Sequence, residues 1–330
     1  MTKTERQAAP VAPTPKGAQH HASRLEEIGS EATRYLEQSK AENTRRAYRA
    51  DWADFVTWCD KYRRSSMPAA PDTVAYYLAD RSQTLKVSTL ERRLATIAEA
   101  HRAASVESPT KSAQVKFVWA GIRREKGTAE AHMKPVLTKH VRAMVNHLPD
   151  SLLGVRDRAL ILLGFAGAMR RSELVGLDVT DLAIADEGLV INVRKSKTDQ
   201  LGAGRKIGVP FGEHPETCPV KAVQAWLDES GIDEGPLFRS VNRHGHMMAT
   251  RLSDQAVADV VKRSLLAAGK SARKYAGHSL RAGLITQAAM AGVSERAIQE
   301  QSGHRSLTVM RRYIRDGSLF RENAAAKVGL

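Results

Sequence analysis

Two neighbouring stretches, Leu189-Val-Ile-Asn-Val193 and Arg205-Lys-Ile-Gly-Val-Pro210, decide the fold, because the hydrophobic period of the chain changes there. Leu189, Ile191 and Val193 recur at every second position, which is the period of a β-strand with one buried face. A polar, glycine-containing loop separates the two stretches. The spacing therefore predicts an antiparallel hairpin.

The hairpin is embedded in helical sequence. Apolar residues at helical spacing precede it in Thr138–His147 and Val155–Ala166, and the same spacing returns from Pro219 onward. This part of the chain is therefore predicted to be mostly α, with a small antiparallel sheet.

The earlier part of the chain predicts an all-α domain. Tyr48, Trp52 and Phe55 follow one another at i, i+4 and i+7, the spacing of one helix face. Proline-containing breaks at 68–71 and at Pro109 divide the region into four or five helices.

Composition divides the chain into four segments. The first is rich in alanine, proline and polar residues without an apolar period, and the third has the small and polar residues of a linker. In order, we predict a disordered tail at 1–22, a helical domain at 23–127, a linker at 128–135 and a mostly α domain at 136–330.

The chain is strongly basic. It has 330 residues, 42% of them hydrophobic, and its 51 Lys and Arg against 36 Asp and Glu give a net charge of +15. This charge predicts a polyanionic partner, either nucleic acid or an anionic membrane surface. The longest uncharged apolar stretch, Ala159–Met169, is far shorter than the roughly 20 residues of a membrane span. With only Cys59 and Cys218 and no apolar signal segment, the sequence predicts a cytoplasmic protein without a disulfide framework or zinc cluster.

The second domain carries residues suited to phosphoryl transfer. Arginines can neutralise a phosphate through bidentate contacts, histidines and a lysine can move protons, and a tyrosine can be the nucleophile. Such a set requires neither a metal ion nor another cofactor. The candidates are Arg170, Glu173, Lys197, His278, Arg281, His304 and Tyr313.

Some of these candidates have alternatives nearby in the sequence. Arg170 and Arg171 are adjacent, and either could simply begin an exposed helix. Lys195, Lys197 and Lys206 all lie in the hairpin, where lysines commonly protect a sheet edge.

The other candidates also have ordinary structural interpretations. His278 precedes Ser279, a plausible helix N-cap, and His304 follows a glycine that could end a helix. Tyr313 could be a half-buried tyrosine at the margin of an apolar helix face.

The order of the candidates resembles that of the tyrosine recombinases, or phage integrases, and most of all their Cre-like branch. The resemblance extends from about Arg24 to the C-terminus and implies the integrase-like catalytic fold. The matching stretches are Met169-Arg-Arg-Ser-Glu-Leu174, the hairpin lysine, His278-Ser-Leu-Arg281, and Gly303-His304 followed nine residues later by Tyr313.

The resemblance implies that Tyr313 attacks the scissile phosphate of duplex DNA, forming a 3′-phosphotyrosyl bond and freeing a 5′-hydroxyl. Arg170 and Arg281 would clamp the non-bridging oxygens, and His304 would hydrogen-bond one of them.

The resemblance assigns supporting roles to the other candidates. Lys197 would protonate the leaving 5′-oxygen, His278 would accept the tyrosine proton, and Glu173 would orient its neighbours. Ser302 occupies a position where leucine is common, and we expect no consequence for the chemistry.

The resemblance also implies a DNA clamp and a homotetramer on two recombination sites. The C-terminal segment 318–330 would dock into a neighbouring protomer; the alternative is a helix folded back on its own domain. Candidates for DNA contact are Arg45, Arg46, Arg49, Ser88, Arg92, Arg93 and Gln255.

The sequence thus predicts a site-specific DNA recombinase that needs no metal or ATP. Two alternatives remain open: a DNA-binding regulator or architectural protein on the same fold, and a relaxing enzyme of the type IB topoisomerase kind. The full set of catalytic candidates favours an enzyme over a regulator.

Overall fold

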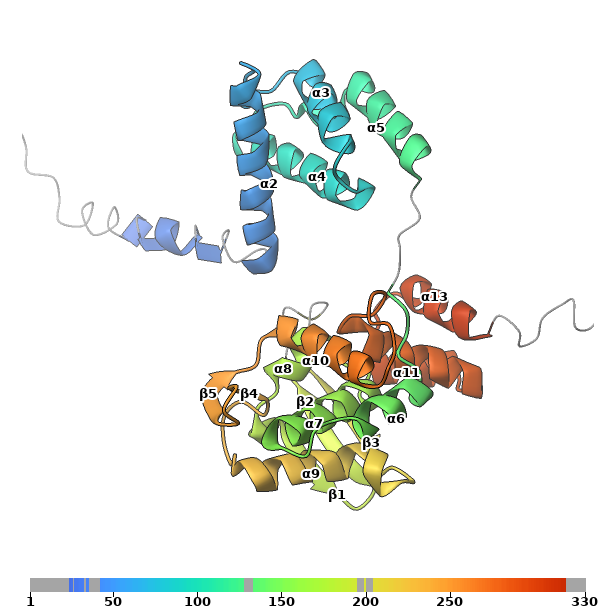
Figure 1. Cartoon of the computed structure of the whole chain (residues 1–330). Coiled ribbons are helices and arrows are strands. Elements are labelled where there is room, and N and C mark those ends of the chain that lie inside the picture. Colours follow the sequence, from blue (N-terminus) through green and yellow to red (C-terminus); the bar gives the residue numbers. More distant parts are fainter. Residues whose placement is uncertain are drawn as a thin grey trace, which may run out of the picture. The chain divides into compact units, whose positions relative to one another are not determined.

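The computed structural model describes residues 24–25, 27–32, 34–35, 42–127, 133–194, 199 and 204–318. The chain divides into two compact units, Met1–Glu130 and Ala131–Leu330 (Figure 1). The predicted tail at 1–22, residues 128–132 of the predicted linker, Lys197, and the C-terminal segment after 318 lie outside the described residues.

The first unit is helical in its described residues. Pro71 occupies the first turn of α3, where its missing N–H costs nothing, and the Ser112 side chain caps α5 by accepting the N–H of Val115. The aromatic side chains of Phe55 and Tyr77 are fully buried in its core. The elements are α2 (Glu42–Lys61), α3 (Pro71–Ser82), α4 (Val87–Ala103), the short 3₁₀ helix η1 (Pro109–Lys111) and α5 (Ala113–Lys126).

The second unit is mostly helical and carries two small sheets, as predicted for the fold class. Its helices are α6 (Thr138–Asn146), α7 (Leu152–Ala166), α8 (Arg171–Gly176), η2 (Val179–Asp181), η3 (Pro215–Thr217), α9 (Pro219–Ser230), α10 (Asp254–Ala267), α11 (His278–Ala291), α12 (Glu295–Ser302) and α13 (Leu307–Ser318). Its strands are β1 (Leu182–Ala185), β2 (Gly188–Val193), β3 (Arg205–Pro210), β4 (Arg239–Val241) and β5 (Met247–Arg251).

The predicted hairpin is confirmed as β2 and β3, which pair antiparallel with Val193 opposite Arg205. Along β3 the side chains alternate, so that Ile207 and Val209 are buried and Lys206 is exposed. The sequence did not predict β1, which pairs with the other edge of β2, or the separate pair β4–β5.

Helix α7 lies at the centre of the main core, in contact with α9 and α11 (Figure 1). It is apolar on most of its circumference because neighbouring elements cover it. Among the described helices, none has both the length and the apolarity that crossing a lipid bilayer requires.

A small separate core joins α11, α12 and α13. Fully buried Met310 of α13 packs in a cluster with Ile285, Ala289 and Ile298, and Tyr313 packs against its edge. The prediction of Ser279 as a helix N-cap is wrong, because α11 begins one residue earlier and the Ser279 hydroxyl instead accepts the N–H of Ala276.

Candidate active site

Arg170 and Glu173 form a buried pair at the start of α8. The backbone N–H of Arg170 donates to Oε2 of Glu173 at 3.0 Å, and its Nη1 donates to Oε1. The Glu173 side chain is fully buried; burial raises its pKa, but the hydrogen bonds and charge of Arg170 outweigh this and lower the pKa overall. Glu173 therefore stays ionised and holds the guanidinium of Arg170.

The geometry separates the two adjacent arginines. Arg170 is buried beside Glu173, whereas Arg171 is directed to Asp254 on α10, with an N–O distance of 3.7 Å. The alternative that Arg170 simply begins an exposed helix is therefore wrong, because its side chain is buried.

Arg281 of α11 lies in the same cluster. Its Nη1 donates to the carbonyl of Ala168, two residues before Arg170, at 2.8 Å, and its Nη2 lies 3.2 Å from both ring nitrogens of His304. Burial, followed by the positive charges of Arg170 and Arg205, lowers the pKa of Arg281 to about 9. The site therefore concentrates positive charge that has lost its hydration, which is an environment suited to an anion.

His304 follows the turn that ends α12. Gly303 adopts the left-handed conformation there, with φ 63°, as predicted for a helix C-cap. Burial, followed by the charges of Arg281 and Arg170, lowers the pKa of His304 to about 3, so the ring is neutral at pH 7. The sequence did not indicate a contact of Ser302, but its buried hydroxyl lies 2.8 Å from Nδ1 of His304.

Arg205, the first residue of β3, is a member of this cluster that the sequence reasoning missed. Its Nη2 donates to Oε2 of Glu173 at 3.2 Å, and its Nη1 donates to the carbonyl of Gln301 at 3.0 Å. A signal was present in the sequence: with a period of two, Arg205 falls on the same face as buried Ile207 and Val209.

The remaining catalytic candidates differ in placement. Tyr313 is partly buried on α13, close enough to Arg281 that the charge of its phenolate form would raise the pKa of the arginine. His278 begins α11, three residues before Arg281, and its side chain is exposed. Lys197 lies outside the described residues, and Lys206 is exposed on β3.

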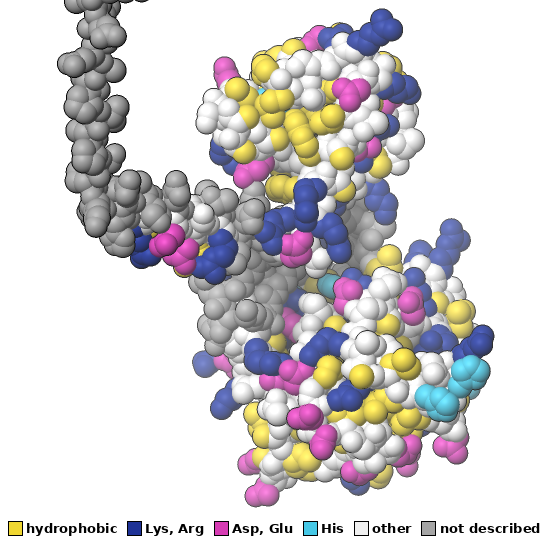
Figure 2. Space-filling view, turned by 90° about the vertical axis from the view of Figure 1, so that its left-hand side faces the viewer, with side chains coloured by type: hydrophobic (Ala, Val, Ile, Leu, Met, Phe, Trp, Pro, Cys, Tyr) yellow, Lys and Arg dark blue, Asp and Glu magenta, His cyan; other side chains and the backbone are white. Residues whose placement is uncertain are grey.

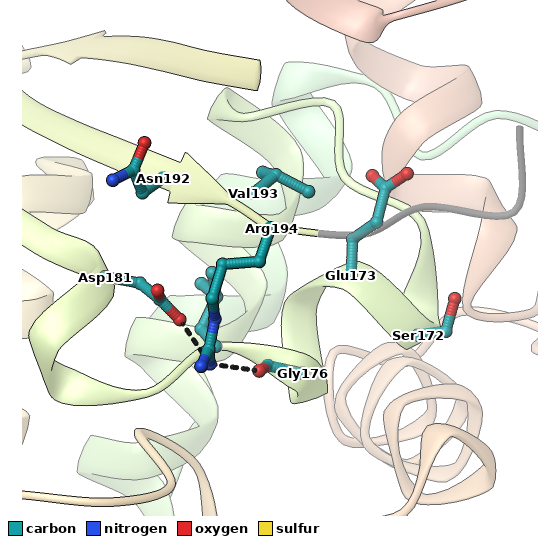
Figure 3. Close-up of a pocket in the computed structure, with 8 residues that line it drawn as sticks. Ser172, Glu173, Gly176, Asp181, Asn192, Val193 and Arg194 are labelled. Atoms are coloured by element: carbon teal, nitrogen blue, oxygen red, sulfur yellow. Dashed lines mark hydrogen bonds and ion pairs between the residues drawn. The ribbon is translucent and has the colours of Figure 1, made fainter. Parts of the chain in front are cut away.

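A pocket of about 410 Å³ lies beside the cluster, between α8 and the end of β2 (Figure 3). Arg194 is directed along this pocket to Asp181 at 2.8 Å and to the carbonyl of Gly176 at 3.5 Å, whereas the Glu173 carboxylate points away from it. Arg194 and Arg205 therefore flank the same hairpin loop at its two ends. Arg194 binds the carboxylate of Asp181, and Arg205 binds that of Glu173.

The basic candidates on α2 are solvent-facing. Arg45 and Arg49 both contact Glu42, the latter at 2.9 Å, and Arg46 donates to the side chain of Asn43 at 3.0 Å. These partners are exposed and local, so a phosphate can replace them at little cost. Figure 2 shows Lys and Arg interspersed with Asp and Glu on the visible faces of the described units.

The basic candidates on α4 are tied to two carboxylates of α2, those of buried Asp51 and half-buried Asp54. Arg92 donates to Asp51 through Nε at 2.6 Å and Nη2 at 3.0 Å, with Asp51 only 4% exposed. Arg93 has a side chain that is 12% exposed and contacts Asp54. Ser88 on α4 is exposed, and exposed Gln255 on α10 donates to Asp259 at 3.2 Å.

Comparisons with known proteins agree with this fold. The sequence pattern of the phage integrase family matches residues 135–318. The chain is 40% identical to the integrase/recombinase XerD homologue of Selenomonas ruminantium, over 91% of this chain and 89% of that one. It is 26% identical to the recombinase Cre of Escherichia phage P1, over 79% of this chain and 80% of that one.

Solved structures share the fold. The XerH site-specific recombinase in a post-cleavage complex with palindromic difH superposes with a TM-score of 0.59 at 19% identity, covering 78% of this chain and 72% of that chain. A lambda integrase tetramer bound to a Holliday junction superposes with a TM-score of 0.57 at 19% identity, covering 87% of this chain and 76% of that chain.

The chain therefore belongs to the phage integrase family, and within it to the tyrosine recombinases. The resemblance drawn from the sequence motifs is confirmed.

Proposed function

We propose that this tyrosine recombinase cleaves and rejoins duplex DNA at specific sites through Tyr313, without a metal ion or ATP. One observation carries the proposal: Arg170 and Arg205 bind the carboxylate of Glu173, and Arg281 lies close by, beside a neutral His304. Three guanidinium groups against one carboxylate leave buried positive charge in excess, which a phosphodiester would neutralise.

In the proposed step, the Tyr313 oxygen forms a bond to phosphorus and the bond between phosphorus and the 5′-oxygen breaks. His278 takes the phenolic proton, and Lys197 supplies a proton to the leaving 5′-oxygen. The phosphate remains a diester, which now links the 3′-oxygen of the DNA to the oxygen of Tyr313. Attack by the 5′-hydroxyl of a partner strand reverses the step and joins exchanged ends.

Arg170 and Arg281 would bind the non-bridging oxygens in this step. Glu173 keeps Arg170 in place, and the carbonyl of Ala168 fixes one arm of Arg281, leaving Nη2 beside His304. Pre-set donors of this kind stabilise charge that develops on phosphate in the transition state.

We further propose that four protomers act on two DNA sites, with segment 318–330 exchanged between neighbours. The tetramer of lambda integrase on a Holliday junction supports this assembly. The exposed arginines of α2 and the exposed Gln255 of α10 are proposed contacts to the duplex.

A selection for covalent adducts tests the cleavage step. The full chain is incubated in EDTA with randomised duplexes that each carry a nick, and adducts that resist SDS are isolated over several rounds. We expect an adduct through a DNA 3′ end, together with a cleaved-off fragment whose 5′-hydroxyl polynucleotide kinase can label. The Tyr313→Phe variant should bind the selected duplex and form no adduct.

The absence of any adduct from the native chain would overturn the proposal. A plasmid carrying two copies of the selected site distinguishes the remaining enzymatic alternative, because a recombinase yields deletion or inversion products and a topoisomerase yields only relaxed circles.

A further inference from the structure

We propose that Arg205 is a positioning residue for DNA cleavage, holding Glu173, and through it Arg170, in the arrangement that receives the scissile phosphate. This inference rests on the proposed function. It assigns a role to a side chain that lies outside the motifs by which the chain resembles its family.

The contacts of Arg205 join three elements. Its Nη2 binds Oε2 of Glu173 on α8 at 3.2 Å, and its Nη1 binds the carbonyl of Gln301 near the end of α12 at 3.0 Å. Its Nε is buried and has no hydrogen-bond partner among the described residues, so these two Nη contacts define its orientation. Arg205 thus links β3 to the turn that carries His304 and to the carboxylate that holds Arg170.

The contact between Arg205 and Glu173 affects Arg170, because both arginines share the negative charge of one carboxylate. Oε1 of Glu173 accepts from Nη1 of Arg170, while Oε2 is shared between the backbone of Arg170 and Arg205. Burial lowers the pKa of Arg205, and the charge of Glu173 offsets only part of this effect. Without Arg205, Glu173 would be balanced by Arg170 alone, and less positive charge would be available to the phosphate.

The side chain of Arg205 packs closely against Gly303 and occupies the space that a side chain at position 303 would need. A Cβ at Gly303 would lie 2.7 Å from Nε of Arg205 and 2.9 Å from its Cζ. The guanidinium therefore rests directly on the backbone of the turn before His304. Displacing Arg205 would disturb both Glu173 and this turn.

The test compares two chemical forms of the selected nicked duplex under single-turnover conditions. In one, the scissile group is the natural phosphodiester; in the other, a methyl group replaces one non-bridging oxygen and makes the group neutral. A neutral group needs much less of the positive charge that the arginines supply. A defect in the arginine arrangement should therefore be relieved on the methylphosphonate, whereas a general loss of structure should not.

We expect Arg205→Ala to slow cleavage of the diester on the order of 10²-fold, and that of the methylphosphonate less than about tenfold. DNA affinity should stay within about threefold of the native value, since the residue acts on the transition state. Arg205→Lys retains the charge without the two-armed geometry, and its rate should lie between those of the native chain and Arg205→Ala.

Arg194→Ala is the matched control, because Arg194 flanks the same hairpin loop but pairs with Asp178 and Asp181 instead of Glu173. Its ratio of diester to methylphosphonate cleavage should equal that of the native chain. Thermal unfolding and DNA binding are measured for every variant. If Arg205→Ala does not fold, Arg205→Lys provides the same comparison of substrates.

The inference is overturned if the Arg205 variants cleave the diester at the native rate, if they are slowed equally on both substrates, or if Arg194→Ala shows the same ratio as they do. These outcomes leave the proposed function intact, because the native chain still cleaves. Absence of cleavage by the native chain on both substrates overturns the proposed function and this inference together.

Discussion

The hydroxyl of Ser302 lies 2.8 Å from Nδ1 of His304, and the same hydroxyl is 3.5 Å from the carbonyl of Gln299. The shorter contact favours donation from the serine to Nδ1, which places the proton of the neutral ring on Nε2. In this tautomer, Nε2–H can donate to a non-bridging phosphate oxygen. We therefore predict that Ser302 selects this tautomer of His304.

Ser302→Ala should slow single-turnover cleavage about tenfold, because Nδ1 loses the partner that selects the Nε2–H form. Affinity for uncleaved DNA should not change, since the hydroxyl is fully buried. Cleavage assays and DNA titrations of the same preparation check both expectations. A native cleavage rate in Ser302→Ala would contradict this assignment of the tautomer.

The stability of the second unit should fall as the pH drops below about 6.5. The folded pKa of His304 is about 3, below its ordinary value of 6.5, so between these values the unfolded chain binds a proton that the folded chain does not. Stability therefore rises with pH across this window and this contribution is constant above it. His140, whose pKa is also lowered, contributes in the same direction.

Urea unfolding at about pH 5 and about pH 7, for the native chain and His304→Gln, isolates the contribution of His304. The variant should lose less stability on acidification than the native chain. Equal losses would show that His304 titrates normally in the folded protein.

Glu173→Gln should destabilise the second unit by about 3 kcal/mol, because it leaves the buried guanidinium group of Arg170 and the half-buried one of Arg205 without their anionic partner. The amide also offers one fewer acceptor oxygen to these donors. Urea unfolding measures the loss. Glu295→Gln is the matched control: Glu295 pairs with Arg311 on the surface, and its loss should cost less than about 1 kcal/mol.

Arg49 and Arg93 should respond differently to removal, although both were candidates for DNA contact. Arg49 has a side chain that is 74% exposed, so Arg49→Ala should reduce the slope of log Kd against log salt concentration by about 1 and leave stability unchanged. Arg93 is tied to Asp54 and to the hydroxyl of Tyr77, so Arg93→Ala should destabilise the first unit by about 1–3 kcal/mol. Salt titrations and urea unfolding of both variants make the comparison.

Met310→Ala should loosen α13, the helix that carries Tyr313. Met310 is fully buried in a core cluster that contains few residues, and its truncation should cost about 2–5 kcal/mol locally. Hydrogen exchange of the α13 amides should accelerate, and cleavage should slow while the main core keeps its protection. Unchanged exchange in α13 would show that other contacts hold this helix.

The fold class and the β2–β3 hairpin could be predicted because the spacing of apolar residues differs between helices and strands. Leu189, Ile191 and Val193 alternate, and all three are buried. Strand β1 escaped prediction because three of its four residues are exposed, so its pairing with β2 leaves little hydrophobic pattern. Strand β4 has only three residues, too few for a period to be recognised.

The candidate site was predictable where residues occur in recognisable order. Arg170, Arg281 and His304 were identified from motifs, and the structure brings them together. Their catalytic roles, and those of Lys197 and the DNA-contacting candidates, stay predictions. Ser302 and Arg205 were missed because their importance lies in tertiary contacts: one touches His304 across a turn, and the other reaches Glu173 from a different element.

Strand β3 begins in the charged cluster and continues into the hydrophobic core. Arg205, Ile207 and Val209 share one face, so a shift of the apolar pair moves the arginine with it. In laboratory evolution of this enzyme, the buried residues of the sheet are therefore positions at which the placement of Arg205 can be adjusted. We therefore expect swaps among aliphatic residues at 207 and 209 to change the reaction rate by moving Arg205.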